Sequence, residues 1–320
     1  MTLPDTTDNR TAFPHSRTQK AGIGFPICRM VGIMCLGSGA VLNVAIGPCV
    51  GKGSGEQSLL RTMLDSTLER GDVLLGDAYY PTYLLLNAMR ERGIDGVFEQ
   101  HGSRKTVTDF RCGKRLGRLD HLIKILKPKK RPAWMTAEDF QRVPASMIVR
   151  ELQVGHKTLI TTLICPLATP SADLAQLYEA RWHVELDFRN IKTTMKMERL
   201  SCTTPEMAIK EIWVYMLAYN LIRLMMAQAA VLAGIEPRQI SFKHTVQIWI
   251  AWSACNFAIN CGDRLHSLFV LIAQQRVGNR PGRIEPRAVK RRPKTYPLLM
   301  QKRELARAKV KKYGHPKKAK

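Results

Sequence analysis

Residues 57–99 are QSLLRTMLDSTLERGDVLLGDAYYPTYLLLNAMRERGIDGVFE, a stretch in which apolar residues alternate between helical spacing and short continuous runs. Helical spacing of leucine and methionine predicts helices, and the short apolar runs predict buried strands. Gly71 and Gly93 follow the two helical patterns as stop signals. The expected elements, in chain order, are a helix over 57–70, a strand over 73–77, a helix over 81–93 and a strand over 96–99. This order predicts a mixed α/β core.

Two further strands are expected upstream, because apolar runs at about residues 28–36 and 40–46 flank a glycine-rich turn. Downstream, the pattern changes to basic strand-like pieces and then to helical spacing. Four segments are therefore expected: 1–100 as the first part of the core, 101–170 as a β-rich insertion, 171–279 as the helical completion of the core, and 280–320 as a basic tail.

The chain is strongly basic, with 50 lysines and arginines against 26 acidic residues and a formal net charge of +24. A local net charge of +13 falls between Pro281 and Lys320, where 15 basic residues accompany only Glu285 and Glu304. Such an excess favours a polyanionic partner, since binding to nucleic acid releases counterions. The tail is either a solvated extension or an ordered DNA-binding segment, and both alternatives favour nucleic acid over a membrane.

The eight cysteines are scattered and form no CxxC pair, which argues against a zinc site. Several stand in apolar stretches, as buried thiols of a reducing compartment do, and this indicates a cytoplasmic protein. Arg29, Asn43 and glycines interrupt the most apolar early stretch before it reaches the ~20 residues that a membrane span needs. No membrane association is expected.

The helix expected at the start of the third segment carries a polar column. With ~100° per residue, four side chains lie within about 40° of Glu185, namely Tyr178, Arg181, Arg189 and Lys192. A carboxylate among cations and a phenol suits phosphate binding. An ordinary surface helix with i to i+4 pairs would contain the same residue types, each pair contributing only ~0.2–0.5 kcal/mol. The exact spacing decides between the two alternatives.

That spacing, Y-x2-R-x3-E-x6-K from Tyr178 to Lys192, resembles the signature of the insertion-sequence-four family of DDE transposases. The resemblance covers essentially the whole chain. Further stretches that look like this family are Arg181-Trp182, Phe188-Arg189, Thr204-Pro205-Glu206-Met207 and Gly282-Arg283-Ile284-Glu285-Pro286-Arg287. The resemblance implies an RNase H-like catalytic core with the β-rich insertion between its second and third acids.

The resemblance also implies roles for the signature residues. Glu185 would be the third metal-binding acid, and Tyr178, Arg181 and Lys192 would bind the phosphates at the end of the mobile element, with Arg189 beside them in the column. In-line phosphoryl displacement between two Mg²⁺ (or Mn²⁺) ions explains the need for carboxylates, because hard cations prefer oxygen ligands.

The second acid of such a site follows the strand after the first helix. Asp77 ends the apolar run 73–76 and fits this position. Asp72 is the local rival, but it precedes the run and would lie at the opposite end of the strand. Asp77 is therefore the expected second metal ligand.

The first acid is expected to be missing from this chain. In the family it stands in an Asp-Gly-Thr segment just upstream of a Leu-Pro-Asp-Thr stretch, which here is residues 3–6. The strand that carries the first acid, the central one of the sheet, would therefore be absent. Asp5 and Asp8 match other positions of the family pattern, and we expect them to shape a loop with Pro4 and Asn9.

Two functions follow as hypotheses. The first is a transposase that cleaves DNA at the ends of an insertion sequence and joins them to a target, acting as a homodimer on two ends and inactive as this shortened chain. The second is a non-catalytic DNA-binding remnant that inhibits the full-length transposase. An RNase H-like nuclease unrelated to mobile elements should lack the spacing from Tyr178 to Lys192.

Overall fold

The computed structural model describes residues 1–16, 24–101, 108–254, 261–278 and 301–314. The chain divides into two compact units. Unit 1 comprises Met1–Arg29, Gly47–Gly51 and Lys196–Lys320, and unit 2 comprises Met30–Ile46 and Lys52–Met195. Most of the expected basic tail, residues 279–300 and 315–320, lies outside the described residues.

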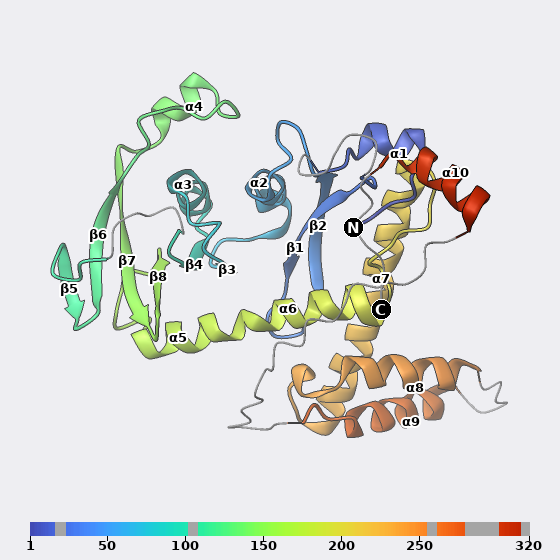
Figure 1. The fold of residues 1–320 in the computed structure, drawn as a ribbon. Helices are drawn as coiled ribbons and strands as arrows, with labels where there is room; N and C mark the ends of the chain where they lie inside the picture. The colour runs from blue at the N-terminus through green and yellow to red at the C-terminus, as the bar shows by residue number, and fades with distance from the viewer. Residues whose placement is uncertain (17–23, 102–107, 255–260, 279–300, 315–320) are drawn as a thin grey trace. The chain divides into compact units, whose positions relative to one another are not determined.

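The strands lie mainly in unit 2. Their bounds are β1 (Cys28–Met34), β2 (Val41–Pro48), β3 (Val73–Gly76), β4 (Asp95–Glu99), β5 (Lys114–Gly117), β6 (Asp120–Leu126), β7 (Ser146–Val154) and β8 (Lys157–Thr161). In the described part of the chain, β1 and β2 pair with each other, while the other six form one sheet in the order β3-β4-β8-β7-β6-β5. Only β3 and β4 run parallel in that sheet. The expected mixed α/β architecture is confirmed (Figure 1).

Helices cover both faces of the six-stranded sheet. The helices of unit 2 are α2 (Glu56–Thr67), α3 (Tyr83–Glu91), α4 (Ala137–Arg142), α5 (Ser171–Ala180), α6 (Trp182–Arg189) and the π-helix η1 (Asn190–Thr194). Because strand side chains alternate between faces, Phe98 packs into the cluster beneath α2 and α3, while Val97 packs with Leu174 of α5. The sheet is therefore the middle layer between helices.

The sheet of β1 and β2 shares a core with the larger sheet through α2. Val31 and Ile33 of β1 belong to the same buried cluster as Leu60 and Leu64 of α2 and Phe98 of β4. In the described residues no strand pairs with β1 on its other side, and β3 is likewise an edge strand. In the described residues β2 and β5 are edge strands as well, and at the start of β1 the backbones of Met1 and Cys28 exchange two hydrogen bonds of 3.0 Å.

The helical segment after β8 is less regular than the expected single α-helix. Near Arg181 the turn tightens, because the Arg181 N–H bonds to the Tyr178 carbonyl, three residues back, at 3.1 Å. At the other end the Met195 N–H bonds to the Asn190 carbonyl, five residues back, at 3.0 Å. Both changes alter the rotation per residue, so the positions along the column do not follow a uniform 100° spacing.

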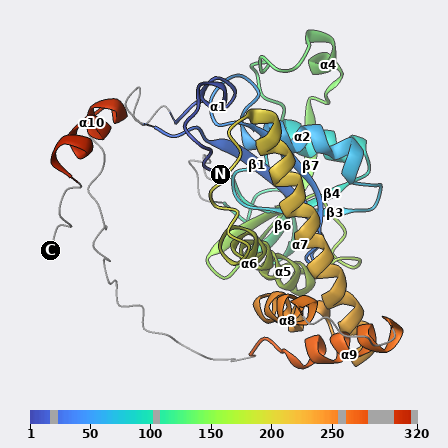
Figure 2. The same cartoon turned by 90° about the vertical axis from the view of Figure 1, so that its right-hand side faces the viewer.

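Unit 1 is largely helical. Its helices are α1 (Thr7–Ala12), α7 (Pro205–Ala233), the 3₁₀-helix η2 (Pro237–Gln239), α8 (Phe242–Ala254), α9 (Cys261–Gln274) and α10 (Arg303–Tyr313). Thr204 caps the start of α7 by accepting a hydrogen bond from the Met207 N–H at 3.4 Å, and Gly234 ends it in the left-handed conformation. Figure 2 shows α8 and α9 beside the far end of α7.

By length and composition, α7 is apolar enough to cross a membrane, and it alone passes that test among the described residues. One face of α7 is nevertheless buried in protein, with Ala208, Ile212, Met226 and Ala230 almost fully covered. A core helix of this kind passes the same test, so the result is weak support for a membrane span.

The loop expected at Asp5 and Asp8 is confirmed for Asp5, which precedes α1, and is wrong for Asp8, which lies in the first turn of that helix. The Thr6 hydroxyl accepts a hydrogen bond from the Asn9 N–H at 3.2 Å and so caps the helix, with Asp8 in its first turn. The same residue types occur in loops and at helix starts. Asn9 also donates hydrogen bonds to the Pro4 and Cys202 carbonyls, and local sequence does not reveal these contacts.

Gly113 offers a test of this fold. Its φ is +76°, and a Cβ placed there would lie 2.1 Å from the Leu122 carbonyl oxygen. We expect Gly113→Ala to destabilise unit 2 by at least about 1–2 kcal/mol from the backbone conformation alone, with the overlap adding to it. Urea unfolding followed by circular dichroism measures this change. Gly155→Ala, also at positive φ but with open space around it, is the matched control and should cost less.

Candidate functional site

Asp77 lies at the edge of the sheet where β3 and β4 end. Gly76 pairs with Phe98, so the next residue on each strand, Asp77 and Glu99, stand side by side. The preceding pair on the same face, Leu75 and Val97, packs into the cluster under α5. Asp77 and Glu99 therefore point to the sheet face that α5 covers. The Asp77 Oδ1 atom accepts a hydrogen bond from the Tyr79 N–H at 2.9 Å, which fixes the turn after β3.

The signature helix presents three connected side chains above this edge. Tyr178 is 5% exposed and packs in the α5 cluster. The guanidinium of Arg181 lies 5.5 Å from the centre of the Tyr178 ring, and its Nη2 atom is 3.4 Å from Glu185 Oε1. The Arg181 Nε–H is buried and has no hydrogen-bond partner within the described part of the chain. A buried donor of this kind can bind a water molecule or an oxygen of a ligand.

The Tyr178 hydroxyl is held by residues that the signature does not contain. It donates to Glu99 Oε2 at 3.4 Å, and the same oxygen accepts a hydrogen bond from Lys157 Nζ at 2.7 Å. Burial raises the pKa of Tyr178 to about 12, with the negative charges of Glu99 and Asp77 adding to the rise and Arg181 opposing it. Tyr178 therefore remains a neutral hydrogen-bond donor at neutral pH, and Asp77 lies within its electrostatic reach.

Arg189 and Lys192 occupy the end of the signature helix and are exposed. Lys192 Nζ lies 6.0 Å from the centre of the Phe188 ring, in the π-helical turn. Neither cation forms an ion pair with the residues that the structure describes, so both are available to an anionic ligand.

The acids do not form a complete metal site. Among the described residues, no group of three or more His, Cys, Asp or Glu side chains is placed to hold a metal ion. Asp5 belongs to unit 1 and binds Arg10 at 2.8 Å. Asp72 lies before β3 and accepts a hydrogen bond from the Glu69 N–H, at the end of the strand away from Asp77. Asp77 and Glu185 have suitable oxygen donors for a hard cation, but two carboxylates do not supply the three-acid set that the family uses.

Glu99 and Lys157 were not found from the sequence. The available signal was that Glu99 ends a strand parallel to the one that ends at Asp77, which brings both carboxylates to one edge. Lys157 gave no signal, because its contact with Glu99 depends on β8 pairing with β4, a crossover that local sequence patterns do not specify.

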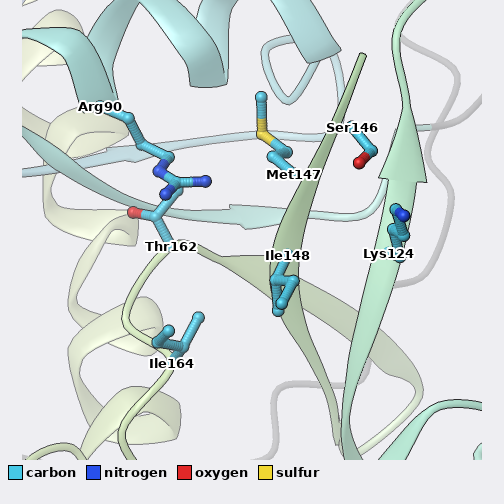
Figure 3. A pocket seen from close by; sticks show the side chains of 7 residues that line it. All are labelled: Arg90, Lys124, Ser146, Met147, Ile148, Thr162 and Ile164. Atoms are coloured by element: carbon cyan, nitrogen blue, oxygen red, sulfur yellow. The ribbon is translucent and has the colours of Figure 1, made fainter. Parts of the chain in front are cut away.

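A cavity of about 450 Å³ lies elsewhere in unit 2 (Figure 3). Its lining residues are Arg90, Lys124, Ser146, Met147, Ile148, Thr162 and Ile164. Thr162 Oγ1 accepts a hydrogen bond from the Gly96 N–H near the start of β4, whereas Glu99 and the neighbouring Asp77 mark the opposite edge. This cavity is therefore separate from the carboxylates.

Comparison with known proteins agrees with the signature. The family model described as "Transposase DDE domain" matches residues 4–221, more than half of the chain, so the chain belongs to the DDE transposases. The transposase InsG for insertion sequence element IS4 of Escherichia coli (strain K12) is 29% identical over 312 residues, which cover 93% of this chain and 67% of that protein. Within the DDE transposases, the chain is a member of the IS4 family, as expected from Tyr178 to Lys192.

A piggyBac transposase, solved as a synaptic complex with hairpin DNA, is 7% identical with a TM-score of 0.41. The likeness covers 86% of this chain and 56% of that one, so this chain spans little more than half of that protein. A TM-score of this size does not establish a shared fold. Membership of the DDE family connects the chain with DNA transposition and with a dependence on divalent metal ions.

Proposed function

We propose that the chain is a transposase that binds the ends of an insertion sequence through its signature helix. Asp77 and Glu185 would be two of the three acids for cleavage and strand transfer. The observation that carries the proposal is the register of β3 on β4. It brings Asp77 to the edge and the sheet face on which Tyr178 and Arg181 lie.

The signature cations would bind DNA phosphates. Arg181 would use its buried, unpaired Nε–H, and Arg189 and Lys192 their exposed charges. Tyr178 would contribute by shaping the site, since its hydroxyl is already directed to Glu99. The net charge of +24 supports attraction of DNA.

The strands β1 to β4 with α2 and α3 would form an RNase H-like core, and β5 to β8 the insertion. Mg²⁺ (or Mn²⁺) would be the metal of the completed site. Because two acids alone do not complete that site, we propose that these 320 residues bind DNA without cleaving it.

The alternative is a non-catalytic DNA-binding protein that inhibits a full-length transposase, by covering element ends or by pairing with the enzyme as a homodimer would. The observation that favours it is that the described residues contain no group of three side chains placed to hold a metal ion. The upstream nucleotide sequence separates the two hypotheses. An in-frame Asp-Gly-Thr segment favours a catalytic transposase, and a stop codon there favours the inhibitor. Both functions would be exerted in the cytoplasm.

Salt dependence of DNA binding tests the phosphate contacts. Each phosphate contact that is lost should lower the slope of log affinity against log salt by about 1. We expect Arg189→Ala and Lys192→Ala each to weaken binding of duplex DNA and to reduce this slope, measured by fluorescence anisotropy over a salt series. Lys124→Ala, an exposed lysine beside the separate cavity, is the control. An equal slope change in all three variants would mean that the helix does not bind the phosphates.

A further inference from the structure

We propose that Glu99 is a positioning residue: held by Lys157, it fixes the Tyr178 side chain and thereby the pose of Arg181 and Glu185. The family signature contains neither Glu99 nor Lys157. The inference deepens the proposed function and rests on it for the role of Arg181 and Glu185 at DNA.

The strand register explains why Lys157 meets Glu99. Glu99 pairs with Leu159 across β4 and β8, and Lys157 lies two residues away on the same face of β8. Diagonal neighbours of this kind are within reach of a long side chain. The resulting distance of 2.7 Å from Lys157 Nζ to Glu99 Oε2 is that of a charge-assisted hydrogen bond. The carboxylate is thus fixed from the sheet side.

Tyr178 transmits this position to the helix. Its ring packs with Val97, Leu159 and Leu174, which anchors α5 on the sheet, and its hydroxyl is directed to the Glu99 oxygen that binds Lys157. The distance of 3.4 Å marks a weak hydrogen bond, so the hydroxyl depends on Lys157 to keep the carboxylate in place.

Arg181 and Glu185 complete a continuous series of contacts. The Arg181 guanidinium lies over the Tyr178 ring, and its Nη2 atom contacts Glu185. The series runs from Lys157 through Glu99, Tyr178 and Arg181 to Glu185. A change at Glu99 is therefore expected to move the helix at Arg181, although the two residues belong to different elements.

The contribution of this pair to global stability is small. The side chains of Glu99 and Lys157 are 30% and 49% exposed, and exposed ion pairs stabilise folded proteins little. Variants at Glu99 should therefore fold. Any change at the signature helix would then report a local displacement and not unfolding.

Fluorine NMR of the 320-residue chain labelled with 5-fluorotryptophan tests the proposal. Trp182 follows Arg181 directly and is 54% exposed, so it reports on this turn of the helix. Its resonance is assigned by its loss in Trp182→Phe. We expect Glu99→Ala and Tyr178→Phe each to shift the Trp182 resonance by more than its linewidth, and Glu99→Gln, which keeps a hydrogen-bond acceptor, to shift it less.

Because both changes cut the same contact, the double variant should shift the Trp182 resonance no further than the larger single shift. An unmoved resonance in Glu99→Ala and Tyr178→Phe, or strictly additive shifts in the double variant, would overturn the proposal. If Glu99→Ala does not fold, the graded comparison of Glu99→Gln with Tyr178→Phe provides the same test.

The control is Asp65→Ala. Asp65 lies on α2, one turn from Arg61, and its carboxylate is paired with Arg92. Arg61 stacks on Trp134 at 3.8 Å, so the control should move the Trp134 resonance and leave that of Trp182 in place. The NMR readout uses no DNA. Shifted Trp182 signals in a chain that fails to bind DNA would refute the proposed function and leave the positioning role intact.

Discussion

Mg²⁺-dependent cleavage or joining of DNA is expected to be undetectable with the purified 320-residue chain, although the same chain should bind duplex DNA. The proposed metal ligands are Asp77 and Glu185, and the described residues contain no cluster of three metal-binding side chains. Two-metal phosphoryl transfer needs carboxylates that bridge and flank both ions. From the proposed two-acid site we expect no product in a gel assay with labelled duplex DNA.

Extension of the chain at Met1 should restore activity. The extension would carry an upstream segment with the Asp-Gly-Thr stretch that the family resemblance implies. A third carboxylate beside Asp77 would complete the proposed metal site. In the extended chain, Asp77→Asn and Glu185→Gln should each return cleavage to background.

Asp72→Asn is the matched control, since Asp72 stands at the other end of β3 and should not affect cleavage. Cleavage by the original 320 residues would contradict the assignment of an incomplete site. Retained cleavage in the extended Asp77→Asn variant would contradict the role of that residue.

The elements of unit 2 that formed at expected positions have strong local patterns. The helices α2 and α3 and the strand β3 lie within a few residues of their predicted bounds, because leucine spacing and flanking glycines mark them. Irregular backbone was not foreseen. The tight turn at Arg181 and the π-helical turn at Asn190–Thr194 are local changes in backbone hydrogen bonding. The spacing of apolar residues does not predict them.

The candidate site likewise combines residues that were assigned from the sequence with residues that were not. Asp77 was assigned from strand polarity and Glu185 from the signature, and both assignments stay predictions. The contact of Tyr178 with Glu99 could not be predicted, because it requires knowing that β8 pairs with β4 and that α5 covers that face. The sequence therefore predicted the residues that a motif fixes, and the structure added those that long-range strand pairing brings to them.

The largest stability effect is expected at Arg150, the largest side chain that is fully buried in the described residues. Its Nε–H donates to Asp120 Oδ1 at 2.8 Å, its Nη2–H to Asp120 Oδ2, and its Nη1–H to the Thr169 carbonyl at 2.6 Å. Asp120 on β6 and Arg150 on β7 thus form a bidentate ion pair between neighbouring strands. Arg150 also binds the loop after β8 through the Thr169 carbonyl. Arg150→Met would leave the Asp120 carboxylate, 12% exposed, without its cation.

We expect Arg150→Met to lower the free energy of unfolding by about 3–5 kcal/mol, because a buried charge that loses its partner keeps its desolvation cost. Asp120→Leu should act similarly. The double variant Asp120→Leu/Arg150→Met removes both charges and should be more stable than either single variant, since apolar replacement of a buried pair avoids that cost. Urea unfolding gives all three values. Arg111→Met, which breaks an exposed pair with Asp109, should leave the midpoint unchanged. A double variant less stable than both single variants would show that the pair itself, and not the cost of isolating one charge, holds β6 to β7.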